Sequence, residues 1–159
     1  MLRLARLTDA PALAEMSREL IEAGLAWRYT PRRMATLIAD RETVTLVAGA
    51  ASHVEGFAVM QFGDEQAHLV LLCVQPAQQR RGIGSQLHEW LVESARVAGI
   101  AAIELELRAD NVAALAFYRS LGYAESSRVS GYYDGRIAAQ RMERRLRQDA
   151  ATPRGEPPR

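Results

Sequence analysis

Two periodicities of apolar and polar residues organise this chain, one typical of strands and the other of helices. An apolar run at residues 69–74, flanked by polar residues, is too short for a membrane span and predicts a strand covered on both faces. Pro76 ends this strand, because proline has no N–H to offer the sheet. Apolar residues then recur at helical spacing and predict a helix. Its expected buried side consists of Ile83, Leu87, Trp90, Leu91, Ala95 and Ala98, with His88 on the outer side.

The same two patterns predict the remaining elements. Further strands are expected around Leu2 and Leu4 and at residues 44–50, 54–62, 101–108, 123–133 and 137–146. Further helices are expected between Pro11 and Gly24, from Pro31 to Ile38, and at residues 112–121 between Asn111 and Gly122. With 159 residues and no internal repeat, the chain has the size of one domain, which we place at residues 1–147. Residues 148–159 carry three prolines and no core positions, and we expect them to be disordered.

The turn between the apolar strand and its helix, residues 79–84 (QRRGIG), combines glycines with basic side chains. Gly82 and Gly84 allow the backbone to approach a ligand closely. The unpaired N–H groups of the first helical turn point toward the same place, and the helix dipole favours negative charge there. Arg80 and Arg81 add guanidinium groups suited to phosphate. The turn therefore predicts a pyrophosphate site.

Spacing separates the possible carriers of that pyrophosphate. A Walker loop needs a lysine, and all 20 basic residues of this chain are arginines. A dinucleotide fingerprint needs a third glycine at the position that Leu87 occupies. What remains is Q-x-x-G-x-G after a strand that ends in V-x-P, and this resembles motif A of the GCN5-related N-acetyltransferases (GNAT), which bind the pyrophosphate of acetyl-CoA.

A second stretch carries the same resemblance. Residues 111–123 fit N-x-x-A-x-x-F-Y-x-x-L-G-Y, which is similar to motif B of the superfamily. From Leu69 to Tyr133 the chain resembles the ribosomal-protein alanine N-acetyltransferase branch, including L-E-x-R-x-x-N at residues 105–111 and the Tyr132-Tyr133 pair. The first 65 residues or so resemble the superfamily only in the order of their elements.

The resemblance implies an α/β (α+β) domain with a mixed sheet of six or seven strands, about four flanking helices and central parallel strands that splay apart. It also implies direct transfer of an acetyl group from acetyl-CoA, the cosubstrate, to a primary amine. By position, the family's cofactor-binding residues correspond to Leu72, Cys73, Val74, Gln79, Arg80, Arg81, Gly82, Ile83, Gly84, Ser85, Asn111, Phe117 and Tyr118.

Two residues take catalytic roles in this comparison. Tyr118 occupies the place of the family's general acid to the thiolate; the alternative is an aromatic pair with Phe117 that only packs the helix. Glu106 matches the glutamate of the L-E-x-R run and is the candidate general base, with a pKa raised by a partly dry cleft. The alternative for Glu106 is an ordinary ion-paired strand face. Asn111 fits both a helix cap and a contact to the pantetheine amides.

The acceptor amine is left open between a small molecule and a protein N-terminus. Five residues either line its pocket or cap the sheet edge: Trp27, Arg28, Tyr29, Tyr132 and Tyr133. The final hairpin at residues 135–139 is shorter than in the alanine-acetylating branch and has alanine where that branch has aspartate. A different class of function, a non-catalytic acyl-CoA sensor or scaffold, would use the same cleft without needing Tyr118 and Glu106.

Net charge and the numbers of cysteines and histidines limit the kinds of partner and metal site that we expect. A net charge of +1 gives no general attraction to nucleic acid or membranes, and we expect neither as a partner. Cys73 is the single cysteine, which excludes an internal disulfide, fits a cytoplasmic location and favours a small buried side chain over a nucleophile. The three histidines show no ligand spacing, so we expect no metal. Dimers are common in the family that the chain resembles, and a homodimer is left open.

Overall fold

A computed structural model of the chain describes residues 1–147. Its strands are β1 Leu2–Leu4, β2 Thr43–Ala50, β3 His53–Phe62, β4 Gln66–Val74, β5 Ala102–Arg108, β6 Ala124–Tyr133 and β7 Ile137–Arg145. Its α-helices are α1 Ala10–Met16, α2 Pro31–Ala39, α3 Ile83–Val97 and α4 Val112–Ser120. A turn of π-helix at Ser17–Ile21 extends α1, and short 3-10 turns lie at Leu7–Asp9 and Pro76–Gln78.

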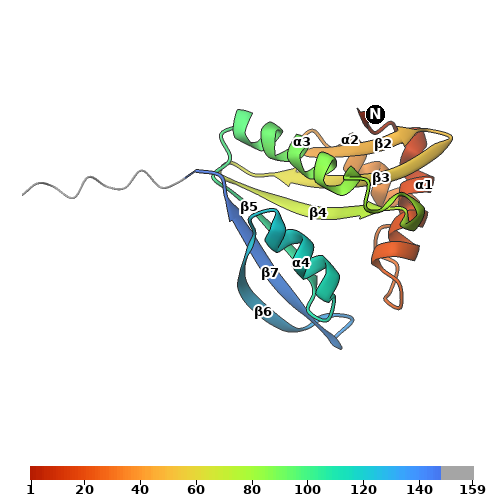
Figure 1. Cartoon of the computed structure of the whole chain (residues 1–159). Coiled ribbons are helices and arrows are strands. Elements are labelled where there is room, and N and C mark those ends of the chain that lie inside the picture. Colours follow the sequence, from red (N-terminus) through yellow and green to blue (C-terminus); the bar gives the residue numbers. More distant parts are fainter. Residues whose placement is uncertain (148–159) are drawn as a thin grey trace, which may run out of the picture.

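The seven strands form one mixed sheet in the order β1-β2-β3-β4-β5-β7-β6. All neighbours are antiparallel except β4 and β5, the parallel pair that α3 connects. Helices cover both faces of the sheet (Figure 1). The predicted mixed sheet of six or seven strands with about four helices is confirmed, and the helices and strands begin and end within a few residues of the predicted positions.

Each face of the sheet has its own apolar core. One core packs α3 and α4 against the sheet through residues such as Leu87, Leu91 and Leu115. The other packs α1 and α2 against the opposite face, through Leu13 and Met34 among others. Burying both faces explains why the central strands are so rich in branched apolar residues.

The centre of the sheet opens between the two parallel strands. β4 pairs with β5 only through Gln66, Ala67 and His68, although β4 continues to Val74. Beyond that point the β5-facing backbone groups of β4 have no strand opposite them. The expected splay is therefore confirmed, and it produces a V-shaped gap with His68 at its apex.

An extra residue in β4 changes which side chains face each core. Met60 of β3 pairs with Leu69, but Val59 pairs with Leu71, so Val70 is left over as a bulge. Leu69 accordingly belongs to the α3–α4 core, whereas Leu71 belongs to the α1–α2 core. The bulge lies beside the splay, where β4 no longer needs to keep register with β5.

Two positions on α3 differ from the prediction. His88, expected on the outer side, is completely buried, and Trp90, expected in the core, is 40% exposed. The buried face consists of Leu87, His88, Leu91, Val92 and Ala95. The physical reason is a partner distant in sequence: the Tyr123 hydroxyl lies 2.8 Å from His88 Nε2 and hydrogen-bonds to this nitrogen of the buried ring.

Two further points concern the C-terminal tail and membrane-spanning helices. The predicted disordered tail, residues 148–159, lies outside the residues that the structure describes. Within residues 1–147, no helix is long and apolar enough to cross a membrane.

Candidate active site

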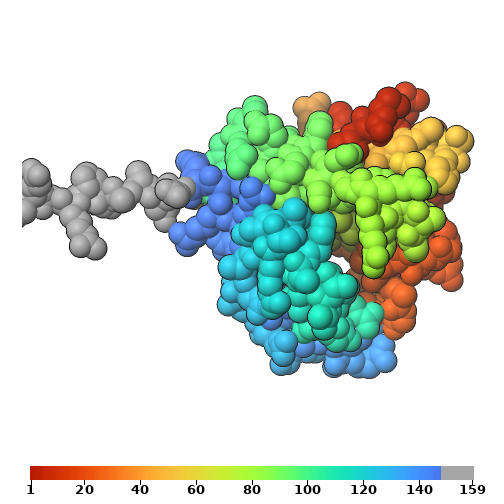
Figure 2. Space-filling model, in the orientation of Figure 1, coloured from red at the N-terminus to blue at the C-terminus, as the bar shows by residue number. Residues whose placement is uncertain are grey.

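A cleft of about 690 Å³ passes through the gap between β4 and β5. One end lies at the turn before α3, and the other lies between the α1–α2 connection and the β6–β7 hairpin. In the space-filling view the surface is hollowed between α4 and the segments that face it, the turn before α3 and the α1–α2 connection (Figure 2). A volume of this size is typical of pockets for cofactors and small substrates.

The end at α3 has the features of an anion site. Gly82 caps the helix in a left-handed conformation, with φ +78°. Within residues 1–147, the backbone N–H groups of Ile83, Gly84 and Ser85 have no hydrogen-bond acceptor, because the first bond of the helix is that from Gln86 to Gly82. These three residues line the cleft, so a diphosphate placed there would receive donors that the fold leaves unpaired.

The two arginines of the turn have different positions. Arg80 lines the cleft and adopts a left-handed backbone with φ +65°, which is uncommon for a residue with a side chain. Arg81 does not line the cleft, and its Nη1 donates to Gln78 Oε1 at 3.1 Å. Gln79 lines the cleft and ties the turn to the strand, since its side-chain amide donates to the Val74 carbonyl at 3.2 Å.

The middle of the cleft is formed by the free edge of β4. Leu72, Cys73 and Val74, predicted to bind the cofactor, line it beside the gap where no β5 residue pairs with them. Cys73 is buried, and this burial raises the pKa of its thiol. A thiol kept protonated is a poor nucleophile, which agrees with the expectation of a small buried residue.

Tyr118 projects from α4 toward the same part of the cleft. Its side chain is largely buried, and burial raises the pKa of the phenol, so the hydroxyl keeps its proton at neutral pH. The ring packs edge-to-face against Phe117 and Tyr123. No residue in 1–147 hydrogen-bonds to the hydroxyl, which leaves its proton available to a bound group. The packing role and an acid role are therefore compatible.

Asn111 caps α4 and lines the cleft at once. Its side-chain oxygen accepts from the Ala114 N–H at 3.1 Å, so the predicted cap is confirmed. Phe117, six residues further along, lies against the start of α3: a Cβ added to Gly84 would be 3.3 Å from the Phe117 ring. Glycine is therefore needed at the two positions for different reasons. Gly82 adopts the left-handed conformation of the helix cap, and Gly84 allows Phe117 of α4 to lie close to α3.

Glu106 lies in the cleft but not in the environment that was predicted for it. Its carboxylate contacts His68 Nε2 through one oxygen, and Arg141 Nε lies 3.4 Å from the other. The hydrogen bond from His68 lowers the pKa of Glu106 and outweighs its partial burial, and Arg141 lowers it further. The expectation of a raised pKa is therefore wrong, because the pairing of β4 with β5 places a hydrogen-bond donor, His68, beside the carboxylate.

The far end of the cleft is lined by tyrosines and a buried carboxylate. Of the residues proposed for the acceptor pocket, the cleft is lined by Arg28, Tyr29, Tyr132 and Tyr133. Trp27 is directed elsewhere, with its indole N–H donating to the Ala14 carbonyl at 3.2 Å. Glu22 lines the cleft and holds the connection in place, accepting from Ser17 Oγ at 2.9 Å and from the Arg28 N–H at 2.7 Å.

Sequence reasoning missed His68, Glu22 and Asp134, all of which line the cleft. No local sequence pattern marks them, since the hydrogen bonds that hold each of them in place form only in the folded chain. No cluster of three or more metal-binding side chains occurs within residues 1–147, and no metal site is assigned.

Comparison with known proteins decides the family. Residues 7–123 match the acetyltransferase (GNAT) family. The chain belongs to this family. The match spans the turn before α3 and helix α4, so it includes every residue discussed at the anion end of the cleft. The family uses acetyl-CoA as its cosubstrate.

Curated relatives match about half of the chain. The [ribosomal protein bS18]-alanine N-acetyltransferase of Escherichia coli K12 is 41% identical over 83 residues, which are 50% of this chain and 56% of that protein. N-alpha-acetyltransferase RimI of Mycobacterium tuberculosis is 47% identical over 60 residues, which are 38% of this chain and 36% of that protein. The chain thus aligns with roughly half or less of the length of these relatives.

Solved structures extend the similarity to the whole fold. The ribosomal-protein-S18-alanine N-acetyltransferase of Escherichia coli superposes with a TM-score of 0.80 and 28% identity, covering 96% of this chain and 97% of that one. Ard1 of Thermoplasma volcanium gives a TM-score of 0.81 at 23% identity, covering 93% and 98%, a likeness of fold alone.

Proposed function

We propose that this protein transfers an acetyl group from acetyl-CoA to the α-amine of a protein N-terminus. The observation that carries the proposal is the cleft itself: three unpaired amide donors at one end, a free strand edge in the middle and a buried phenol beside that edge. Similarity to N-terminal acetyltransferases, by sequence over half of the chain and by fold over nearly all of it, supports a peptide acceptor over a small amine.

The anion end would hold the diphosphate. The N–H groups of Ile83, Gly84 and Ser85 point their partial positive charge at it, and the Arg80 guanidinium adds a full charge. The pantetheine arm would then lie along Leu72–Val74 and hydrogen-bond to the free edge of β4 as an added strand does. This arrangement delivers the thioester to the middle of the cleft.

Acyl transfer requires a neutral amine, a polarised carbonyl and a proton for the departing thiolate. The Tyr118 phenol is placed to give that proton, because burial keeps it protonated at neutral pH and the same burial makes a thiolate that forms beside it more basic. Glu106 provides the negative charge on the acceptor side, where an ammonium must lose a proton before it can attack. Backbone N–H groups of β4 are available to polarise the carbonyl.

A thiol-release assay tests the proposal. Full-length protein is mixed with acetyl-CoA and hexapeptides that begin with alanine, serine or methionine, and free CoA and peptide mass are measured. Matched peptides with an already acetylated N-terminus serve as controls, and a polyamine, a free amino acid and an aminoglycoside represent small acceptors. We expect CoA release and addition of one acetyl group only with free peptide N-termini.

Two results would contradict the proposal in different ways. Release with a small amine and not with peptides would keep the chemistry and exclude the protein acceptor. Tight binding of CoA with no amine-dependent release from any acceptor would instead support the non-catalytic sensor.

A further inference from the structure

The inference concerns the group that takes the acceptor's proton, and it rests on the proposed function. Glu106 is a weak candidate for that task by itself, because both of its oxygens are engaged by nitrogen donors. His68 lines the same cleft at the apex of the gap between β4 and β5. We propose that His68 is the general base of the reaction and that Glu106 is the residue that orients its ring.

The hydrogen bond to Glu106 decides which ring nitrogen carries the proton. An ionised carboxylate can only accept, so His68 Nε2 must donate its hydrogen to Glu106 Oε2. In the neutral ring the lone pair is then on Nδ1, which has no partner within residues 1–147. A carboxylate that fixes the tautomer of an imidazole and stabilises its charged form is the arrangement that activates histidine bases in other enzymes.

The surroundings of the pair are polar on every neighbouring strand. Strand pairing places Gln61 of β3 and Glu104 of β5 opposite His68, and Arg141 of β7 opposite Glu106. Glu143 pairs with Glu104, Tyr133 lies near Glu106, and Arg108 follows Glu106 on the same face of β5. Arg141 compensates Glu106 only partly, because its Nε is 3.4 Å from the carboxylate and its side chain is 47% exposed. Acidic side chains therefore face His68 from β5 and β7, and the Nε2 hydrogen bond to Glu106 is the contact that fixes its ring.

The proton balance of the step is complete without another reagent. The acceptor's ammonium gives one proton to His68 Nδ1, and the freed lone pair attacks the thioester carbonyl. As the carbon–sulfur bond breaks, the thiolate takes the proton of Tyr118, and the nitrogen loses a second proton that restores the phenol through solvent. One proton is released in total, from the His68 imidazolium, whose side chain is 39% exposed and thus in contact with water.

The test replaces each member of the pair by glutamine in the full-length chain. His68→Gln keeps an N–H donor for Glu106 but removes the ring nitrogen that takes the proton; we expect kcat with a peptide acceptor to fall on the order of 10²-fold, the usual scale for a positioned base. The KM for acetyl-CoA should not change, and the decline of kcat/KM on the acidic side should disappear. Glu106→Gln should lower kcat but keep that acidic decline, since the imidazole that takes the proton is still present.

The opposite pattern overturns the inference. If His68→Gln stays within a few-fold of the parent and Glu106→Gln loses the acidic decline, the carboxylate is the base. His53→Gln, at an exposed position of β3 outside the cleft, is the matched control and should match the parent. A parent that releases no CoA with any amine would overturn the proposed function together with this inference, whereas an active parent with an unaffected His68→Gln overturns this inference alone.

Nitrogen-15 NMR of the histidine rings provides a second readout that does not depend on turnover. We expect the neutral His68 ring to carry its proton on Nε2 in the parent and to lose that preference in Glu106→Gln. A proton found on Nδ1 of the parent would remove the lone pair that the proposed step needs and would overturn the inference.

Discussion

At the scale of single residues, the site depends on side chains held in unusual states rather than on rare residue types. Tyr118 is an ordinary aromatic residue that burial keeps protonated beside a free strand edge. Arg80 is an ordinary arginine whose left-handed backbone directs it toward the cleft. Both states cost free energy, and both are explained if the cleft binds a thioester and a diphosphate.

Removal of the Tyr118 hydroxyl tests the acid role. Tyr118→Phe keeps the edge-to-face packing with Phe117 and Tyr123, so the fold should be unchanged. We expect kcat to fall by about 10²-fold or more, since a positioned acid contributes on this scale, with little change in affinity for acetyl-CoA. Steady-state kinetics and calorimetry measure the two quantities. A kcat within a few-fold of the parent would leave Tyr118 with a packing role only.

Arg80→Gly should change the free energy of unfolding and the affinity for CoA in opposite directions. Glycine adopts φ +65° without the steric cost of about 1 kcal/mol or more that a side chain incurs, so we expect the free energy of unfolding to rise by about 0.5 kcal/mol. Affinity for CoA should fall about tenfold with the loss of a charged contact to phosphate. Arg81→Gly is the matched control: residue 81 does not line the cleft, and we expect lower stability with a smaller change in affinity. Equal losses of affinity in both variants would contradict the placement of Arg80.

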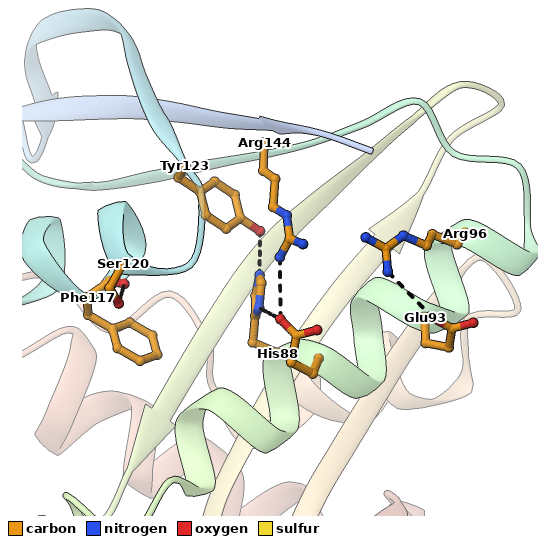
Figure 3. A network of polar contacts seen from close by, with 8 residues as sticks. His88, Glu93, Arg96, Phe117, Ser120, Tyr123 and Arg144 are labelled. Atoms are coloured by element: carbon orange, nitrogen blue, oxygen red, sulfur yellow. Dashed lines mark hydrogen bonds and ion pairs between the residues drawn. The ribbon is translucent and has the colours of Figure 1, made fainter. Parts of the chain in front are cut away.

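At the scale of elements, the contact between α3 and the turn after α4 contains a buried titratable group. His88 of α3 points toward the Tyr123 hydroxyl, with Arg144 of β7 beside them (Figure 3). Glu89 lies 3.4 Å from both His88 Nδ1 and Arg144 Nη1. Burial lowers the pKa of His88 most strongly; Arg144 lowers it too, and Glu89 raises it.

The lowered pKa of His88 predicts a loss of stability in acid. The unfolded chain binds the proton at a pKa of about 6.5, whereas the folded chain resists it, so the contribution is complete above about pH 6.5 and is lost as the pH falls below that value. We expect the Tm of the parent to fall more steeply between about pH 7 and pH 5.5 than that of His88→Gln, which retains a donor for Tyr123 without titrating.

Thermal melts across that pH range measure the difference. His53→Gln, which removes an exposed histidine, should retain the parent's slope. Identical slopes in the parent and in His88→Gln would show that another group controls stability in this range.

At the scale of the whole molecule, segments far apart in the sequence meet at the acceptor end of the cleft. The Ala26 N–H donates to Asp134 Oδ2 at 2.9 Å, although the two residues are 108 positions apart. Arg108 Nη1 donates to the Ala23 carbonyl at 3.0 Å, and Arg136 Nη2 donates to that of Gly24 at 3.4 Å. These bonds join the α1–α2 connection to the β6–β7 hairpin and to the end of β5, and so define the opening through which an acceptor would enter.

Weakening this junction should raise the KM for the acceptor peptide and leave the KM for acetyl-CoA unchanged. In Asp134→Ala the Ala26 N–H loses its charged partner, a bond of about 1 kcal/mol, so we expect the KM for a peptide acceptor to rise several-fold. The KM for acetyl-CoA should remain unchanged. Asp134→Asn is the matched control, because asparagine tolerates the left-handed backbone at this position and keeps an acceptor oxygen. An unchanged peptide KM in Asp134→Ala would exclude a role of the junction in acceptor binding.

The elements and the anion site were predictable because their signals are local. Strands alternate and helices recur within a few residues, and Gly82 with Gly84 mark the turn before α3 by spacing alone. The bulge at Val70 and the π-helical turn at Ser17–Ile21 were not predicted, since neither changes the local pattern. His88 was placed on the wrong side of α3 because its hydrogen-bond partner is 35 residues away.

What the amino-acid order determined by itself is the family and the cosubstrate end of the cleft. That end is built from consecutive residues, so spacing between glycines, arginines and a helix start is sufficient to recognise it. Only the tertiary structure decided which groups form hydrogen bonds and ion pairs with Glu106 on the acceptor side of the cleft. His68 and Glu106 are 38 residues apart, and they meet because the last pair that β4 and β5 share places His68 opposite Glu104, two residues before Glu106. A hydrogen bond between distant residues leaves no periodic signal in a sequence, and the protonation state of a carboxylate depends on that bond.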